Sequence, residues 1–171
     1  HLLHINLSEK QKMFYFTTCG WMMWNWLVGS LFCKSSIVLY EGSPFYPNPE
    51  HLWELCEKSK VSIFGTSAKY IDALSKSNVV PKKHFTLNNL RTICSTGSPL
   101  SPDSYDYILN NIKPEVQISS ISGGTDLLSC FVLSNPFSPV TKGEIQCRAL
   151  GMDVDIFNEN GESLVNDEGE L

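Results

Sequence analysis

The sequence predicts an α/β fold: a layer of parallel strands with helices on both faces, followed by the start of a small antiparallel β subdomain. Short apolar, β-branched segments alternate with amphipathic segments as far as residue 120, which is typical of βαβ units. After Gly124 the alternation stops, and strand-like segments follow one another with no helix between them. The length of 171 residues is sufficient for a sizeable core.

The first part of the chain contains the expected sheet and its helices. The expected strands are residues 12–18, 36–40, 61–66, 90–95 and 116–120. The expected helices are residues 21–32, 50–59, 67–76 and 101–112, where apolar residues recur at helical spacing. We expect Pro49 to open the second helix. We also expect Ser101 to cap the last one, with Pro102 in its first turn.

The last part of the chain has the pattern of antiparallel strands. We expect strands at residues 129–133, 144–147 and 154–157, with a tight turn at residues 158–161 (Asn-Glu-Asn-Gly). We place the division of the chain near Val140. Residues 1–139 then form the α/β part, and residues 140–171 form the start of the small β subdomain, which is incomplete.

Composition excludes several function classes. Thirteen Lys and Arg residues against 18 Asp and Glu residues give a formal net charge of −5, without the dense basic patch of a nucleic-acid-binding protein. The six cysteines are scattered without a CxxC pair, which argues against zinc and is typical of a reduced, cytosolic protein. The most apolar run, residues 20–33, is interrupted by Asn25 and is shorter than the ~20 residues of a membrane span.

Polar loops follow three of the expected strands: residues 18–21, 95–100 and 120–126. Ligands of open parallel sheets bind beyond the carboxyl ends of the strands. Gly, Ser and Thr allow the backbone to approach a nucleotide, and the adjacent Thr125 and Asp126 suit a phosphate oxygen and Mg²⁺. An ordinary turn is the better explanation for either of the last two loops taken alone, whereas two such loops at one edge favour a nucleotide site more. Neither common nucleotide fingerprint, GxGxxG or GxxxxGK[ST], is present.

Taken in order, several segments resemble the adenylate-forming superfamily of acyl-CoA synthetases, luciferases and peptide-synthetase adenylation domains. Within it, the acetoacetyl-CoA synthetases are the most similar. The segments are GWMMWNW at 20–26, LYEGSP at 39–44, STGSPL at 95–100, SSISGGTD at 119–126 and KGEIQC at 142–147. The resemblance extends over nearly the whole chain. It implies an internal fragment of the large N-terminal domain of such a ligase.

The resemblance implies a two-step reaction. The carboxylate of acetoacetate attacks the α-phosphate of ATP, which gives acetoacetyl-AMP and pyrophosphate, and CoA then displaces AMP. The implied cofactors and substrates are ATP, Mg²⁺, CoA and acetoacetate. The implied parent is an acid-thiol ligase of lipid metabolism, located in the cytosol.

The resemblance also implies a nucleotide site and a metal ligand. Gly97, Ser98 and Pro99 would lie along the adenine, and Thr125 would contact the α-phosphate. Asp126 would hold Mg²⁺ where most of the superfamily has Glu. The other wall of the AMP site would be Ser120, Ile121, Ser122, Gly123 and Gly124.

The implied acyl pocket is formed by Trp21, Met22, Met23 and Gly123. In the acetate-using relatives a Trp occupies the position of Gly123 and closes the pocket. A glycine there would leave space for the longer acetoacetyl group.

Other functional parts of the superfamily would lie outside these 171 residues. They are the phosphate loop with its Lys, the ribose-binding Asp and the lid with the catalytic Lys. We therefore expect this piece to be inactive without the N- and C-terminal parts of its parent. Two alternatives stay open: a synthetase for another short carboxylate, and a non-catalytic domain that retains a nucleotide-sized cleft.

Overall fold

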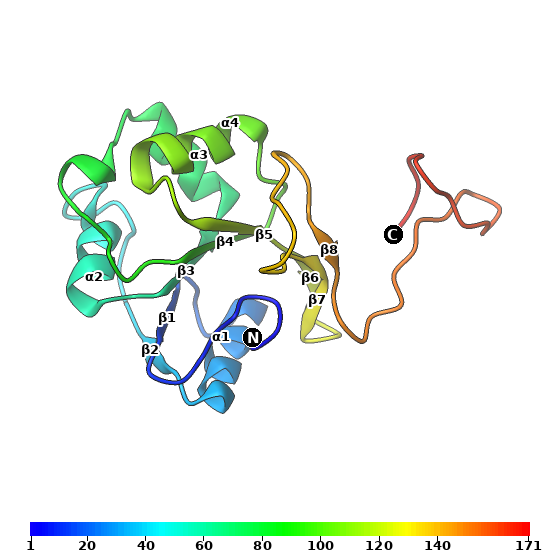
Figure 1. Cartoon of the computed structure of the whole chain (residues 1–171), viewed down its shortest axis with the longest axis horizontal. Coiled ribbons are helices and arrows are strands. Elements are labelled where there is room, and N and C mark those ends of the chain that lie inside the picture. The colour runs from blue at the N-terminus through cyan, green and yellow to red at the C-terminus, as the bar shows by residue number, and fades with distance from the viewer.

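The computed structural model describes residues 1–171 and contains a five-stranded parallel sheet with the order β2-β1-β3-β4-β5 (Figure 1). The strands are β1 (Lys12–Tyr15), β2 (Ser36–Val38), β3 (Ile63–Ser67), β4 (Thr92–Thr96) and β5 (Gln117–Ser120). The predicted fold class is therefore confirmed. β1 is shorter than expected, because residues 16–20 leave the sheet before the first helix begins.

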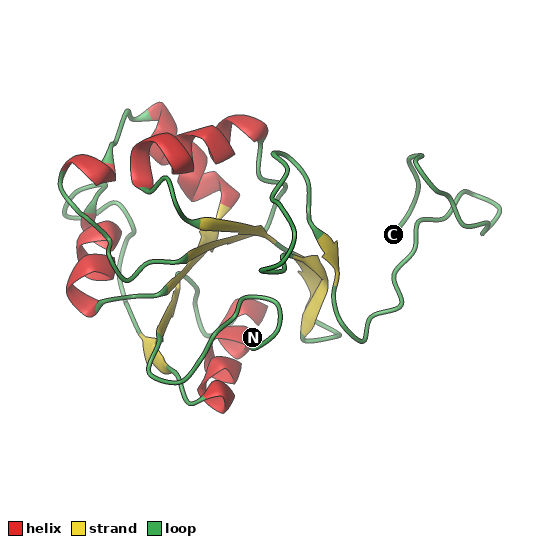
Figure 2. Ribbon diagram, viewed as in Figure 1, coloured by secondary structure: helices red, strands yellow, loops and turns green.

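Helices lie on both sides of this sheet (Figure 2). They are α1 (Met22–Gly29), η1 (Ser30–Cys33), α2 (His51–Ser59), α3 (Ala68–Lys76), η2 (Pro81–Lys83), α4 (Pro102–Tyr107) and η3 (Ile108–Ile112). Ser101 caps α4 as predicted, since its Oγ accepts a hydrogen bond from the backbone N–H of Ser104 at 3.3 Å. The prediction for Pro49 was wrong. It lies in the turn before α2, and Glu50 occupies the N-cap position.

Alternating strand residues separate the core into two layers, because successive side chains of a strand point to opposite faces. Phe14, Phe64 and Ile93 face α2, α3 and α4 in the larger cluster. Met13 and Ile63, their neighbours along the strands, face α1 in the smaller cluster. A parallel sheet covered in this way needs apolar residues on both faces, which explains the nearly continuous apolar runs in the sequence.

A small antiparallel sheet follows, as predicted, with the order β6-β7-β8. Its strands are β6 (Ser122–Gly124), β7 (Ser129–Leu133) and β8 (Cys147–Arg148). β6 was expected to be a loop, because a Ser-Gly-Gly segment has no strand propensity of its own. β7 pairs with β8 across the division expected near Val140, so this sheet joins the two parts of the chain.

The segment after β8 extends away from the sheets (Figure 1). The predicted turn forms, since Gly161 donates its N–H to the carbonyl of Asn158 at 3.0 Å. The strand expected at 154–157 does not form. Phe157 alone makes isolated bridges, to Ser163 and Glu170.

The strand order brings the loops of interest to one edge. β2 lies on one side of β1, while β3, β4 and β5 lie on the other. The direction of winding therefore reverses between β1 and β3, and a crevice outside their carboxyl ends is the expected ligand position in such a sheet. None of the helices has the length and hydrophobicity needed to cross a bilayer.

Candidate functional site

A cavity of about 430 Å³ lies beyond the carboxyl ends of β4 and β5. It brings together most of the residues that the sequence assigned to nucleotide binding. Its lining consists of Thr96, Gly97, Ser98, Pro99, Leu100, Ser120, Ile121, Ser122, Gly123, Gly143 and Ile145. Two loops far apart in the sequence thus form the walls of one cleft.

Two hydrogen bonds hold these loops together. The Thr96 hydroxyl donates to the carbonyl of Ile121 at 3.1 Å, and the N–H of Ile121 donates to the carbonyl of Ser95 at 2.8 Å. Gly97 has a φ of +89°, a conformation that disfavours any residue with a side chain. The turn after β4 therefore depends on glycine at this position.

A third segment covers the same cavity and was not among the predicted site residues. Gly143 and Ile145 line it, and the Tyr105 hydroxyl of α4 donates to the carbonyl of Glu144 at 2.9 Å. An ion pair between Lys142 and Asp106 connects the segment to α4 at a second point. The motif KGEIQC at 142–147 was the sequence signal for this wall, although it had suggested no contact.

An adjoining cavity of about 240 Å³ contains the residues expected to form the acyl pocket. Its lining is Tyr15, Phe16, Thr17, Trp21, Met22, Met23, Thr66, Ser67, Thr96, Gly97, Gly123, Gly124 and Thr125. It lies at the carboxyl ends of β1 and β3, where the winding of the sheet reverses. Tyr15 and Thr66 belong to this wall and were missed, because a strand residue in the sequence does not reveal which cavity its end will face.

The two cavities share Thr96, Gly97 and Gly123. A carboxylate in the smaller cavity and a nucleotide in the larger one would therefore be neighbours. A carboxylate can attack a nucleotide phosphate only if the two are held next to each other, and adjoining cavities allow this.

β6 and β7 approach one another closely at Gly123, which is opposite Cys130 in the register. A Cβ atom at Gly123 would overlap the carbonyl oxygen of Ser129 and stand 3.0 Å from the Cα of Cys130. Gly123 is therefore required by the backbone of the hairpin, in addition to any space that it leaves for a substrate.

Thr125 and Asp126 lie in the exposed turn of this hairpin, which is closed by a hydrogen bond from the N–H of Leu128 to the carbonyl of Thr125 at 3.2 Å. The chain has no group of three or more His, Cys, Asp or Glu side chains that could hold a metal. Mg²⁺ takes only one or two protein carboxylates and completes its shell with substrate phosphates and water, so the single exposed carboxylate of Asp126 is compatible with such an ion.

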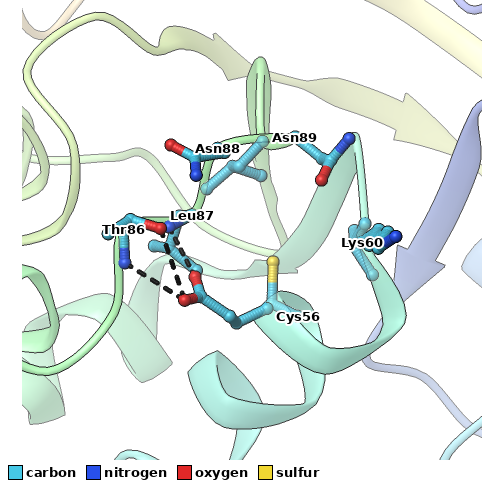
Figure 3. A pocket seen from close by; sticks show the side chains of 9 residues that line it. Cys56, Lys60, Thr86, Leu87, Asn88 and Asn89 are labelled. Atoms are coloured by element: carbon cyan, nitrogen blue, oxygen red, sulfur yellow. Dashed lines mark hydrogen bonds between the residues drawn. The ribbon is translucent and has the colours of Figure 1, made fainter.

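The amino-terminal edge of the sheet has a separate cavity of about 210 Å³ between α2 and the loop before β4 (Figure 3). The Glu57 carboxylate accepts hydrogen bonds from the N–H groups of Leu87 at 2.6 Å and Thr86 at 3.4 Å. Lys113 donates from the other side to the carbonyls of Leu87 and Leu90. Glu57 and Lys113 thus bind the protein's own backbone, which gives both groups a structural role beside this cavity.

Comparison with known proteins agrees with the geometry of the carboxyl edge. The family model described as AMP-binding enzyme matches residues 2–171. The chain belongs to the AMP-binding enzyme family.

Curated members of this family resemble the chain over its whole length. It is 48% identical over 171 residues to the acetoacetyl-coenzyme A synthetase of Rhizobium meliloti (strain 1021) and 48% identical to the acetoacetyl-CoA synthetase of Gallus gallus. It covers 26% of each, so it spans about a quarter of the length of these relatives. The solved structure of acetoacetyl-CoA synthetase from Streptomyces lividans matches 98% of the chain, with 37% identity and a TM-score of 0.92.

Proposed function

We propose that this chain is an internal part of the large N-terminal domain of an acetoacetyl-CoA synthetase. The longer protein would convert acetoacetate and ATP to acetoacetyl-AMP and pyrophosphate, and then transfer the acyl group to CoA with release of AMP. The observation that carries the proposal is the pair of adjoining cavities that share Thr96, Gly97 and Gly123. The identity of 48% to named acetoacetyl-CoA synthetases supports the choice of substrate.

The larger cavity would bind the nucleotide. Gly97, Ser98 and Pro99 would lie along the adenine, and the segment 120–124 would form the opposite wall. Both walls expose backbone and small side chains, which allow a planar base to approach closely. The Thr125 hydroxyl would donate to the α-phosphate.

Asp126 would hold Mg²⁺ together with the phosphates. The ion supplies charge neutralisation at the phosphates when it is bound. Asp126 is exposed in a hairpin turn, where its carboxylate is accessible to an ion that remains largely hydrated.

The smaller cavity would bind the acyl group, between Trp21, Met22 and Met23 on one side and Gly123 on the other. Glycine at 123 would set the acyl length. In the full-length enzyme, Gly123→Trp should shift the preference from acetoacetate toward acetate. Because any side chain at 123 overlaps the Ser129 carbonyl, thermal unfolding of the variant must be measured alongside. An unchanged preference in a folded variant would contradict this assignment.

The phosphate loop, the ribose-binding Asp and the lid Lys would be supplied by other parts of the parent chain, and the 171 residues alone would be inactive. We propose a cytosolic location for the parent. All six cysteines are unpaired, and three of them are buried, as expected for a protein kept in a reducing compartment.

The test is pyrophosphate release by the full-length protein with a panel of short carboxylic acids. Acetoacetate should give the highest kcat/KM. A different preferred acid would indicate a synthetase for another carboxylate. Absence of release with every acid, together with retained ATP binding, would indicate a non-catalytic nucleotide-binding domain.

A further inference from the structure

The segment 142–147 forms a third wall of the larger cavity and is attached to α4. It belongs to the long connection between β7 and β8, which passes beside α4 (Figure 1). Gly143 and Ile145 line the cavity. The residue between them, Glu144, accepts a hydrogen bond on its carbonyl from the Tyr105 hydroxyl of α4 at 2.9 Å. This bond therefore acts directly on the backbone that carries the two wall residues.

Tyr105 is a rigid point of attachment. Its side chain is 1% exposed and belongs to the larger core cluster, and its helix is capped by Ser101. Burial raises the pKa of Tyr105, and the charge of Glu144 adds to this effect, while the side chain of Ser120 acts in the opposite direction. At neutral pH the hydroxyl keeps its proton and is a hydrogen-bond donor.

The other polar contacts of the segment hold it less firmly to α4. The ion pair between Lys142 and Asp106 is exposed, and pairs of this kind contribute little. The side-chain amide of Gln146 donates to three carbonyls of the connection itself, at residues 135, 138 and 139, so it orders the connection without attaching it to the helix. The hydroxyl of Tyr105 is thus the main polar attachment of this wall to α4.

We infer that Tyr105 is a positioning residue for the nucleotide: its hydroxyl holds Gly143 and Ile145 in place, so that they contact the adenosine part of the bound nucleotide. This inference rests on the proposed function, which assigns the nucleotide to the larger cavity. Tyr105 acts through the segment, since it does not itself line the cavity. A wall that is ordered before the ligand arrives loses less conformational freedom on binding, so release of the wall should weaken binding.

Substitution of Tyr105 by Phe in the full-length protein tests the inference, because it removes only the hydroxyl. The readout is the dissociation constant of AMP, measured by titration calorimetry. AMP contains the adenosine part and the α-phosphate alone. Its dissociation constant should rise by about 3- to 10-fold, the range for net loss of one hydrogen bond. The KM for acetoacetate should change by less than about twofold, because neither Gly143 nor Ile145 lines the smaller cavity.

Tyr107→Phe is the matched control in the same helix. Tyr107 is 6% exposed, and its hydroxyl donates to the carbonyl of Val79 at 2.8 Å, outside both cavities. Each variant loses one bond from a buried tyrosine to a backbone carbonyl, so both should unfold at a somewhat lower temperature than the wild type. The dissociation constant of AMP should rise in Tyr105→Phe and stay at the wild-type value in Tyr107→Phe.

Ile145→Ala tests the wall itself and leaves α4 unchanged. It should also weaken AMP binding, because it removes apolar surface from the cavity. In the double variant with Tyr105→Phe, the two losses should be less than additive, since the hydroxyl acts through the segment that carries Ile145.

Three results would overturn the inference: an unchanged dissociation constant in Tyr105→Phe, an equal rise in Tyr107→Phe, or fully additive losses in the double variant. Failure of the proposed function is visible separately, in the wild-type protein. If that protein binds AMP but releases no pyrophosphate with acetoacetate, the proposed reaction fails, and the AMP dissociation constants of the variants still decide the role of Tyr105. If it does not bind AMP, the proposed function and the inference both fail.

Discussion

The carbonyl oxygen of Ser129 occupies the space in which Gly123 would place a side chain. The two residues lie on the neighbouring strands of the β6–β7 hairpin, in which Gly123 pairs with Cys130, Gly124 pairs with Ser129, and the register shifts between Ser122 and Gly123. The hairpin lines both cavities through Gly123. The close contact between the two strands therefore determines the shape of the common wall of the proposed acyl and nucleotide sites.

Alanine substitutions at the two hairpin glycines should have different effects on stability. Gly123→Ala forces a methyl group against the Ser129 carbonyl, and overpacking of this kind costs about 1–3 kcal/mol. At Gly124 a Cβ would make ordinary contacts with Phe131 and Leu127 at 3.6 and 3.7 Å, so Gly124→Ala should change stability by less than about 0.5 kcal/mol. Thermal unfolding of the two full-length variants measures the change in stability caused by each substitution. Equal unfolding temperatures would contradict the close approach at Gly123.

Glu57 should be important for stability although it lies far from the proposed site. Glu57→Ala leaves the N–H of Leu87 without its partner, which costs about 1–3 kcal/mol. The matched control is Glu54→Ala in the same helix, which removes partly exposed contacts to Lys58 and His51 and should leave the unfolding midpoint nearly unchanged. Urea unfolding gives the midpoint and the free energy of unfolding of both variants. A lower unfolding midpoint for Glu54→Ala together with an unchanged midpoint for Glu57→Ala would contradict the stabilising role of Glu57.

Asp126 should control the requirement for Mg²⁺. In the full-length protein, Asp126→Asn should raise the Mg²⁺ concentration for half-maximal pyrophosphate release by about 10- to 100-fold, the effect typical of losing a carboxylate around a bound metal. Asp153→Asn changes another exposed acid, outside both cavities, and should have no effect. An Mg²⁺ titration of each variant provides the measurement. An unchanged midpoint in Asp126→Asn would exclude it as a ligand.

Alkaline pH should destabilise the fold through its buried thiols. Burial raises the pKa of Cys56 and of Cys94 from an ordinary value of 9.0 to about 12. Between these values the unfolded thiol loses its proton while the folded one retains it. Stability is therefore fully present below pH 9 and is lost as pH rises toward 12, by up to about 1.4 kcal/mol per pH unit for each thiol.

The thiol of Cys56 can be tested alone with Cys56→Val, which has a similar volume and no titratable group. Urea unfolding at several pH values between 8 and 11 should show a weaker pH dependence for the variant than for the wild type. An identical dependence in both proteins would show that Cys56 does not contribute.

Local patterns predicted the α/β fold and many of the residues that line the two cavities. The apolar runs of β3 and β4 identified central strands, and Ser101 followed by Pro102 identified the start of α4, because both signals depend on neighbours in sequence. The loops 95–100 and 120–126 were predicted to meet because parallel strands present their carboxyl ends at one edge. That they share a cavity agrees with this expectation.

Other features depend on contacts between distant parts of the chain. β6 is a strand only because β7 pairs with it, since Ser122, Gly123 and Gly124 have no strand propensity of their own. Residues 144–147 and 154–157 have strand composition but few partners. Of these residues, only Cys147 belongs to a strand, β8, and only Phe157 forms bridges, which are two isolated ones. Strand pairing is a property of two segments together, and one segment cannot reveal it.

The order of residue types along the chain was thus sufficient for the alternation of strands and helices, the edge of the sheet at which two polar loops meet, and the family. The position of Tyr15 against Gly65, the contact of Gly123 with Ser129 and the cover that Gly143 and Ile145 form over the larger cavity came only from the folded molecule. The physical reason is one of range. Backbone propensity and hydrophobic periodicity act over a few residues, whereas the walls of a cavity are set by close packing between segments that lie far apart in the sequence.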